Sequence, residues 1–169
     1  GLLALFARAL GGVASDKLAH TRGLDGRVTL LFALMLAEGV GLIVFSQMGT
    51  ATRALVAMLI FGLFTHMACG ATYSLVPFVN RKALGGVAGI VGAGGNVGAV
   101  AAGFLVKGTD TTQHALFLLG TTVALSAICA IAVRFSSEHK AEERQLYREA
   151  LAARAAQIET DAVPEAMPS

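Results

Sequence analysis

Charged residues are absent from three long stretches of the chain, residues 54–80, 83–106 and 111–133, and residues 28–52 contain only Glu38. These stretches are rich in Leu, Ala, Val, Ile, Phe and Gly. A helix needs about 20 consecutive apolar residues to cross the hydrocarbon core of a bilayer. The pattern therefore predicts four complete transmembrane helices, over about 28–47, 54–77, 85–106 and 114–133.

Both ends of the chain differ from this pattern. Residues 1–14 are apolar but too few for a complete span, and we expect them to be the end of a fifth transmembrane helix. Because this apolar segment starts without a Met, we expect the chain to be a piece of a longer protein. Residues 135–169 are polar, and they predict a tail that is helical after a cap at Ser136 or Ser137 and disordered from Ile158 onward.

The composition agrees with a membrane protein. Hydrophobic residues make up 55% of the chain and charged residues only 14%, which is more apolar than a typical soluble domain. The fold class that we predict is an all-α integral membrane protein. Its transmembrane region would occupy residues 1–134 and its tail residues 135–169.

The loop charges predict an orientation in the membrane. Lys and Arg are frequent in the predicted loops 15–27 and 78–84 and at the start of the tail, but rare in the loops 48–53 and 107–113. Since basic loops stay on the cytoplasmic side, the first group is expected to face the cytoplasm, together with the C-terminus. We predict a multi-pass protein of the plasma or inner membrane. The basic residues lie in separate loops, so no nucleic-acid partner is expected.

The segment from Gly85 to Gly103 is unusually rich in glycine. On a helix, its small residues and one amide form a narrow stripe, made of Gly85, Gly89, Gly92, Asn96, Ala99 and Gly103. Small residues let neighbouring helices approach closely in a membrane, so tight packing by other helices is one interpretation. Because an amide in hydrocarbon needs a partner, contact of Asn96 with a small ligand is the other.

A few further polar residues lie inside the predicted spans. Arg8 is expected near mid-membrane, where an Arg usually faces a cavity or a partner and suits a planar oxyanion. Glu38 is compatible with pairing to a basic group, carrying a proton or a structural role. His66 is expected to be structural, and Tyr73, on roughly the same helix face, is a candidate for lining a pathway.

Catalytic chemistry is not indicated. No nucleophile, metal cluster or acid–base pair occurs at a recognisable spacing. We therefore predict no enzyme, no metal site and no cofactor.

Two segments carry a resemblance to known proteins. The loop GGVASDKLAHTRGLDGR resembles the cytoplasmic loop signature of the major facilitator superfamily, with matches at Gly12, Asp16, Lys17 and Arg22. The region around GAGGNVG, from Gly92 to Gly98, looks like the nitrate signature of the nitrate/nitrite porter family. The segment FARALGG resembles the part of that family that carries a substrate-binding arginine.

This resemblance implies a fold and a function. The chain would be the C-terminal part of a twelve-helix bundle, from a partial eighth helix to the twelfth, in a secondary carrier that transports nitrate, and also nitrite, by alternating access. Its partners would be the nitrate or nitrite anion, the lipid bilayer, the missing N-terminal half and protons as a candidate coupling ion. The substrate-binding residues would be Arg8 and Asn96, with Tyr73 added from its position, and the glycine signature would comprise Gly89, Gly92, Gly94, Gly95 and Gly98.

Two other functions stay open at this point. The first is a major facilitator carrier for another small solute, for which the glycine signature and Arg8 would be unusual. The second is a non-transporting membrane scaffold or sensor, which would not need a buried Arg.

Overall fold

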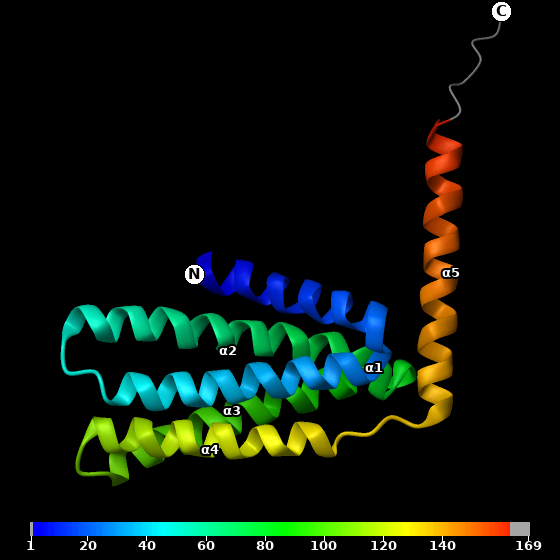
Figure 1. Ribbon diagram of the computed structural model, residues 1–169. Coiled ribbons are helices and arrows are strands. Elements are labelled where there is room, and N and C mark those ends of the chain that lie inside the picture. Colours follow the sequence, from blue (N-terminus) through cyan, green and yellow to red (C-terminus); the bar gives the residue numbers. More distant parts are fainter. Residues whose placement is uncertain (1, 163–169) are drawn as a thin grey trace, which may run out of the picture. The chain divides into compact units, whose positions relative to one another are not determined.

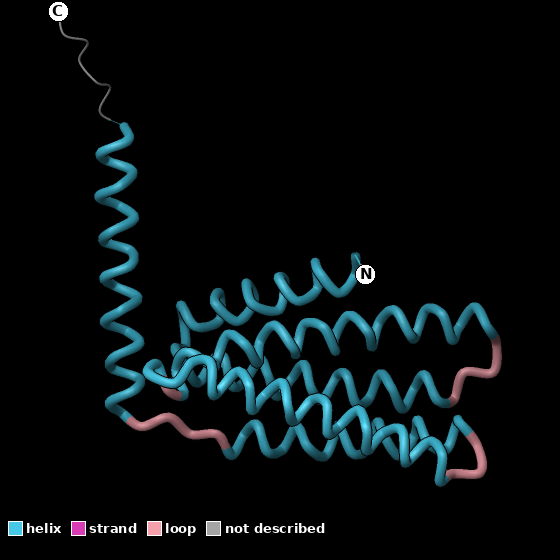
Figure 2. Tube along the Cα trace, turned by 180° about the vertical axis from the view of Figure 1, so that it is seen from behind, coloured by secondary structure: helices cyan, strands magenta, loops and turns pink. Residues whose placement is uncertain are grey.

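The computed structural model describes residues 2–162, and helices connected by short turns make up that part of the chain (Figures 1 and 2). The elements are α1 (Leu2–Ser46), α2 (Ala51–Val79), the 3₁₀ turn η1 (Arg81–Ala83), α3 (Leu84–Gly108), α4 (Thr112–Ala132) and α5 (Ser137–Ala162). The chain divides into two compact units, residues 1–134 and 135–169, which are described separately.

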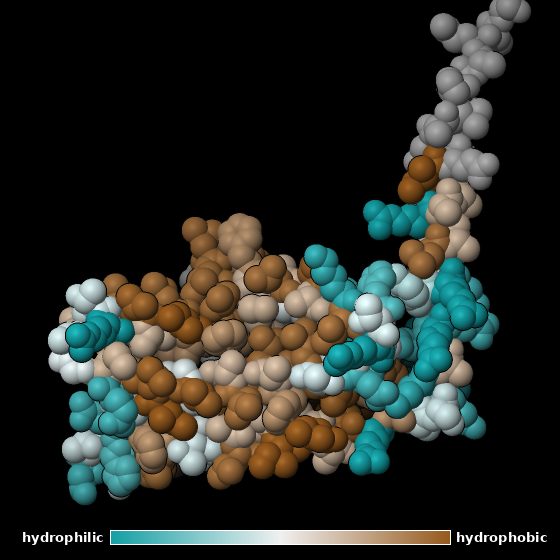
Figure 3. All heavy atoms as spheres, in the orientation of Figure 1, coloured by the Kyte–Doolittle hydropathy of each residue, from teal (hydrophilic) through white to brown (hydrophobic). Residues whose placement is uncertain are grey.

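Within the described residues, four helical segments are long and apolar enough to cross a membrane: α1, α2, Arg81–Gly108 and α4. Many of their large apolar side chains are exposed, including Phe6, Ile90 and Phe104. On the face shown in Figure 3, apolar side chains cover the middle of the bundle and hydrophilic ones gather toward the ends of its helices. Such an outer surface suits lipid, since only structures with internally satisfied backbones span a bilayer. The predicted all-α membrane fold is confirmed.

The helix α1 reverses direction at Gly23. Its 45 residues include one non-helical position, Gly23, with φ 59° and ψ −147°, a conformation that glycine adopts without a steric penalty. We call residues 2–22 the first arm and residues 24–46 the second arm. Figure 1 shows the two arms running in opposite directions. Most of the predicted loop 15–27 is thus helical, because no Gly or Pro interrupts it before Gly23.

Glycines hold the first arm against α2. A Cβ atom added at Gly11 would collide with the backbone of Met67, and one added at Gly70 would collide with the carbonyl oxygen of Arg8. Ser15 continues this contact, since its hydroxyl lies 2.7 Å from that of Ser74. In a membrane, where the hydrophobic effect does not drive helices together, such close backbone approach supplies the packing energy.

The second arm packs between α2 and α4 in the same way. A Cβ at Gly41 would lie 2.8 Å from the Phe61 side chain of α2, and a Cβ at Gly39 would lie 2.5 Å from the Ala124 backbone of α4. Gly120 of α4 faces the carbonyl oxygen of Gly39 in return. A buried cluster forms where the second arm meets α2, at Leu34, Ala68 and Ala71, with Leu30, Leu31, Met35, Phe64 and Met67 around it.

The glycine-rich helix α3 is the exception to this packing. None of its residues is buried. The expectation that neighbouring helices surround it closely is therefore not met within the described part of this chain. The physical reason is that only a few residues of α2 and α4 approach it, so most of its small-residue surface has no partner among them.

The second unit contains α5. Ser136 caps this helix, because its hydroxyl accepts a hydrogen bond from the His139 N–H at 3.3 Å and lies 2.8 Å from the His139 Nδ1. The helix continues to Ala162, beyond the expected start of disorder at Ile158. Residues 163–169 lie outside the described residues.

The close contact between Gly11 and α2 can be tested by mutation, with the neighbouring Gly12 as a control. We expect Gly11→Ala to destabilise the protein by about 1–3 kcal/mol, the usual cost of overpacking, because the added methyl group meets the α2 backbone. The free energy of unfolding can be measured by thermal unfolding in detergent. Gly12→Ala is the matched control: its Cβ would have no atom within 4 Å, so stability should be unchanged or higher. An equal loss for both variants would contradict the close contact at Gly11.

Candidate functional site

The predicted anion ligand Arg8 lies on the first arm of α1. Its side chain is exposed, and its backbone carbonyl lies against Gly70 of α2. Its guanidinium forms no hydrogen bond or ion pair with any other described residue. The side chain is therefore available to a ligand or to a partner, which is what a binding role requires.

Tyr73 connects α2 to the glycine signature on α3. It lies one helical turn after Gly70, and its hydroxyl is 3.9 Å from the Cβ position of Gly92. Asn96 follows Gly92 by one turn and is exposed. The structure thus brings Tyr73 to the glycine signature, but it forms no direct contact between Arg8 and Asn96 among the described residues.

The helix α3 has two different small-residue faces. Asn96 stands two residues from both Gly94 and Gly98, so it points about 160° away from each of them around the helix. Gly94, Gly95 and Gly98 line a cleft that α3 forms with α1, α2 and α4, and Asn96 does not. Of the stripe that contains Asn96, only Ala99, at its edge, also lines the cleft; the other α3 residues of the cleft lie on a different face of the helix.

This glycine cleft has a volume of about 1110 Å³. Gly94, Gly95, Gly98, Ala99, Ala101, Ala102 and Leu105 of α3 form one wall, and Met35, Glu38, Leu42, Phe61, Thr65, Leu116, Leu119, Thr122, Val123 and Ser126 of the other helices form the rest. Apart from Leu105, the residues of the α3 wall are Gly and Ala, so most of that wall is smooth. The glycines of the signature and the mid-span acid Glu38 therefore meet in one space.

The polar groups of the glycine cleft come from three helices. Glu38 belongs to α1, Thr65 to α2, and Thr122 and Ser126 to α4. Each hydroxyl donates to a carbonyl of its own helix, at 3.0 Å for Thr65, 2.9 Å for Thr122 and 2.7 Å for Ser126. Thr65 and Glu38 line this cleft together. Glu38 is the only charged residue among the cleft's lining residues.

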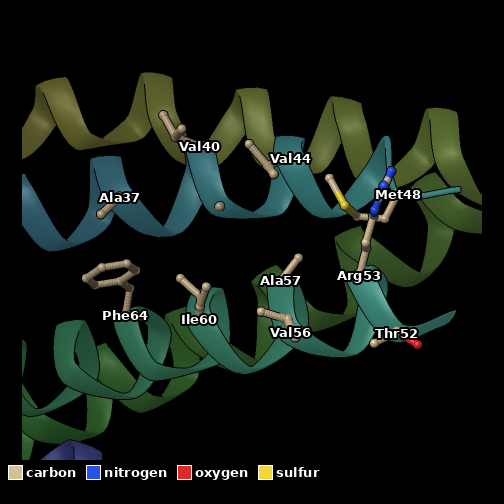
Figure 4. A pocket seen from close by; sticks show the side chains of 11 residues that line it. Ala37, Val40, Val44, Met48, Thr52, Arg53, Val56, Ala57, Ile60 and Phe64 are labelled. Carbon is tan, nitrogen blue, oxygen red and sulfur yellow. The ribbon is translucent and has the colours of Figure 1, made fainter. Parts of the chain in front are cut away.

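A second cavity, of about 600 Å³, lies between the second arm of α1 and α2 (Figure 4). Its lining is apolar except at one end, where Thr52 and Arg53 lie in the first turn of α2. A site for a small polar ligand needs several convergent polar groups. This cavity does not offer them along its length, so it is a poor candidate for an anion site.

Around the reversal at Gly23, Arg27 joins the two arms of α1. Its Nη1 donates to the Asp16 carboxylate at 2.7 Å and to the Ser15 hydroxyl at 3.3 Å. The guanidinium carbon lies 5.0 Å from the centroid of the Phe78 ring of α2, within range of a cation–π interaction. The buried Arg27 side chain thus contacts the first arm and α2 together.

Among the four predicted loop-signature residues, the structure gives Asp16 a defined ion-pair partner. Lys17 and Arg22 are exposed, and Gly12 has open space around its Cβ position. From the sequence, Arg27 is considered only as one of the basic residues of the predicted loop 15–27. Nothing in its sequence context separates Arg27 from Arg22, because its burial depends on where the helix reverses.

Comparison with known proteins identifies relatives of the chain. It is 36% identical over 135 residues to "High affinity nitrate transporter 2.5" of Arabidopsis thaliana, covering 79% of this chain and 26% of the relative. It is 40% identical over 115 residues to "Nitrate transporter 2.2" of Chlamydomonas reinhardtii, covering 67% of this chain and 22% of the relative. It is also 38% identical over 100 residues to "Nitrate/nitrite transporter NrtP" of Picosynechococcus sp., covering 57% and 18%.

The chain spans about a quarter of the length of the first two of these relatives. A match over 79% of the chain necessarily includes its middle, where α3 and the glycine signature lie. No family model and no solved structure matches the chain.

The ion pair between Arg27 and Asp16 can be measured in a double-mutant cycle with Arg27→Gln and Asp16→Asn. The Asp16 side chain is 63% exposed, so we expect a coupling free energy of only about 0.2–1 kcal/mol. Thermal unfolding of the two single variants and the double variant gives this value. A parallel cycle with Arg22→Gln and Asp16→Asn should give no coupling, because the ion-pair partner of Asp16 is Arg27 and not Arg22. A larger coupling in the control cycle would contradict the pairing.

Proposed function

Because the chain is a relative of the nitrate and nitrite porters of the major facilitator superfamily, we propose that it is part of a secondary carrier for nitrate, and also for nitrite. The observation that carries the proposal is the match to nitrate transporters across the glycine helix α3. The substrate would cross the membrane by alternating access, without a catalytic step.

The chemistry of the substrate suits the predicted ligands. Nitrate is a small, planar anion with one negative charge, and a guanidinium binds such an oxyanion through two parallel hydrogen bonds. In our proposal Arg8 supplies this contact, while Asn96 and Tyr73 complete the site or fix the helices beside it. The support is that Arg8 is exposed, and that Tyr73 and Asn96 lie on neighbouring turns where α2 approaches α3.

The remainder of the pathway would come from the rest of a longer protein. The relatives are about four times as long as their match to this chain. We propose that an N-terminal half covers the exposed faces of the first arm and of α3, including Arg8 and Asn96. Rocking of one half against the other would then expose the anion site to each side of the membrane in turn.

Membrane orientation follows from the loop charges. In our proposal, Gly23, Asp16 and Arg27 face the cytoplasm, together with the polar helix α5 and the C-terminus. The membrane would be the plasma or inner membrane. Protons are a candidate coupling ion for the uptake of an anion.

The role of Arg8 can be tested in the full-length protein that contains this chain, in cells that lack other nitrate transport. Arg8→Lys keeps the positive charge but loses the planar, bidentate donor. We expect nitrate uptake to fall roughly tenfold or more at equal membrane abundance, the effect of losing one charge-assisted hydrogen bond.

Arg53→Lys is the matched control, because Arg53 lies beside the apolar cavity and not in the proposed site. It should leave uptake unchanged. If Arg8→Lys takes up nitrate as well as the wild type, Arg8 is structural and the anion site lies elsewhere. If the wild type is correctly inserted and takes up no nitrate, the substrate is another solute or the protein does not transport.

The chain alone is not expected to transport. Residues 1–169 reconstituted in liposomes should give no nitrate flux above that of empty liposomes, because Arg8 and Asn96 then lack the opposing half. Nitrate flux through this piece would show that the other half is not needed for the pathway.

A further inference from the structure

We propose that Glu38 is a proton-binding site that controls how closely α3 packs against the rest of the bundle. The inference rests on the proposed function, for which it names the position of the coupling proton. In the proton-free form the glycine cleft is open and hydrated, and in the protonated form α3 closes over it. The proposal follows from the placement of the acid, the composition of the cleft and the freedom of α3.

The first argument is the isolation of the charge. Glu38 lies midway along the second arm of α1, in a segment that is long and apolar enough to span a membrane. The cleft residues that face it from α2, α3 and α4 include no other titratable or charged group. Only the hydroxyls of Thr65, Thr122 and Ser126 add polarity, and each already donates to its own helix.

The second argument is the energetic difference between the two forms of the acid. A carboxylate without a cation nearby requires water, whereas a neutral carboxylic acid is satisfied by one or two hydrogen bonds. The Thr65 hydroxyl lines the same cleft and already donates to the Phe61 carbonyl, so it can offer the acid only its acceptor lone pairs, which the protonated form alone can use. Proton binding therefore removes the need to keep the cleft hydrated.

The third argument is the wall opposite the acid. Gly94, Gly95 and Gly98 present almost no side-chain surface to the cleft, so α3 can approach α1 and α4 without a steric obstacle. No residue of α3 is buried against the other described helices. Few contacts with them would therefore have to break for α3 to move toward Glu38. The same helix carries Asn96 on its opposite face, and its movement would be transmitted to the proposed anion site.

The first test measures closure of the cleft without transport. In full-length protein with Cys69→Ala and Cys129→Ala, Ala102→Cys places a thiol on the α3 wall. Ala93→Cys, on the same helix outside the cleft lining, corrects for the intrinsic pH dependence of thiol labelling. We expect the ratio of the two labelling rates to fall about fivefold or more on mild acidification, and to be independent of pH when Glu38→Gln is added. A ratio with the same pH dependence in both backgrounds overturns the proposal.

The second test measures coupling in proteoliposomes of the full-length protein. Glu38→Gln should retain exchange of labelled nitrate across the membrane within about twofold, but should lose about tenfold or more of the proton movement that accompanies net nitrate uptake. Glu38→Asp, which keeps a carboxyl group, should restore part of the proton movement. Glu142→Gln, an exposed acid of α5, should behave as the wild type.

The outcomes separate the two proposals. Proton movement by Glu38→Gln equal to that of the wild type overturns the role of Glu38 while the carrier function stands. Loss of both exchange and proton movement, with no recovery in Glu38→Asp, makes Glu38 a structural carboxyl and also overturns it. If the wild type moves no nitrate, the proposed function fails, and the labelling test still decides whether Glu38 controls the cleft.

Discussion

Close backbone contact at glycines is the constraint on which the bundle depends. The second arm of α1 meets α4 through Gly39 and α2 through Gly41, and the first arm meets α2 through Gly11 and Gly70. Each of these contacts is short because no Cβ separates the two helices. In a membrane this geometry supplies dispersion energy that apolar side chains facing lipid do not. The glycines of α3 have no such close backbone partner among the described residues.

The sequence predicts the elements of this fold better than their contacts. Uncharged length alone is sufficient to locate α2, α3 and α4, because the thickness of the bilayer sets the length of a span. The sequence predicts a loop in the polar segment before Gly23, but this segment is helical. Polar residues mark where a helix leaves the membrane, and they do not by themselves end the helix. The Asp16–Arg27 pair depends on the reversal at Gly23, and no local pattern reveals which of several basic residues becomes buried there.

The candidate site shows the same division. Arg8, Tyr73 and the glycine signature could be proposed from residue type and resemblance, and the structure brings Tyr73 to Gly92. The sequence could not predict that Glu38 and the signature glycines line one cleft. These residues are about 60 positions apart, and the packing of α1, α2 and α4 brings them together. A helical wheel separates the Asn96 face of α3 from its Gly98 face, but it cannot say which face meets the other helices.

The arrangement of charges around α2 has a consequence for anion transport. The backbone of Arg8 contacts α2 at Gly70, and Glu38 shares the glycine cleft with Thr65 of the same helix, about 7.5 Å nearer its N-terminus. Moving one negative charge against a membrane potential costs about 2.3 kcal/mol per 100 mV, and a proton that travels with the anion cancels this cost. A proposed anion ligand and a proposed proton site on two sides of one helix would allow both charges to respond to a single movement of α3. In this proposal, α3 with its two small-residue faces would change its distance from Glu38 and from Arg8 at the same time.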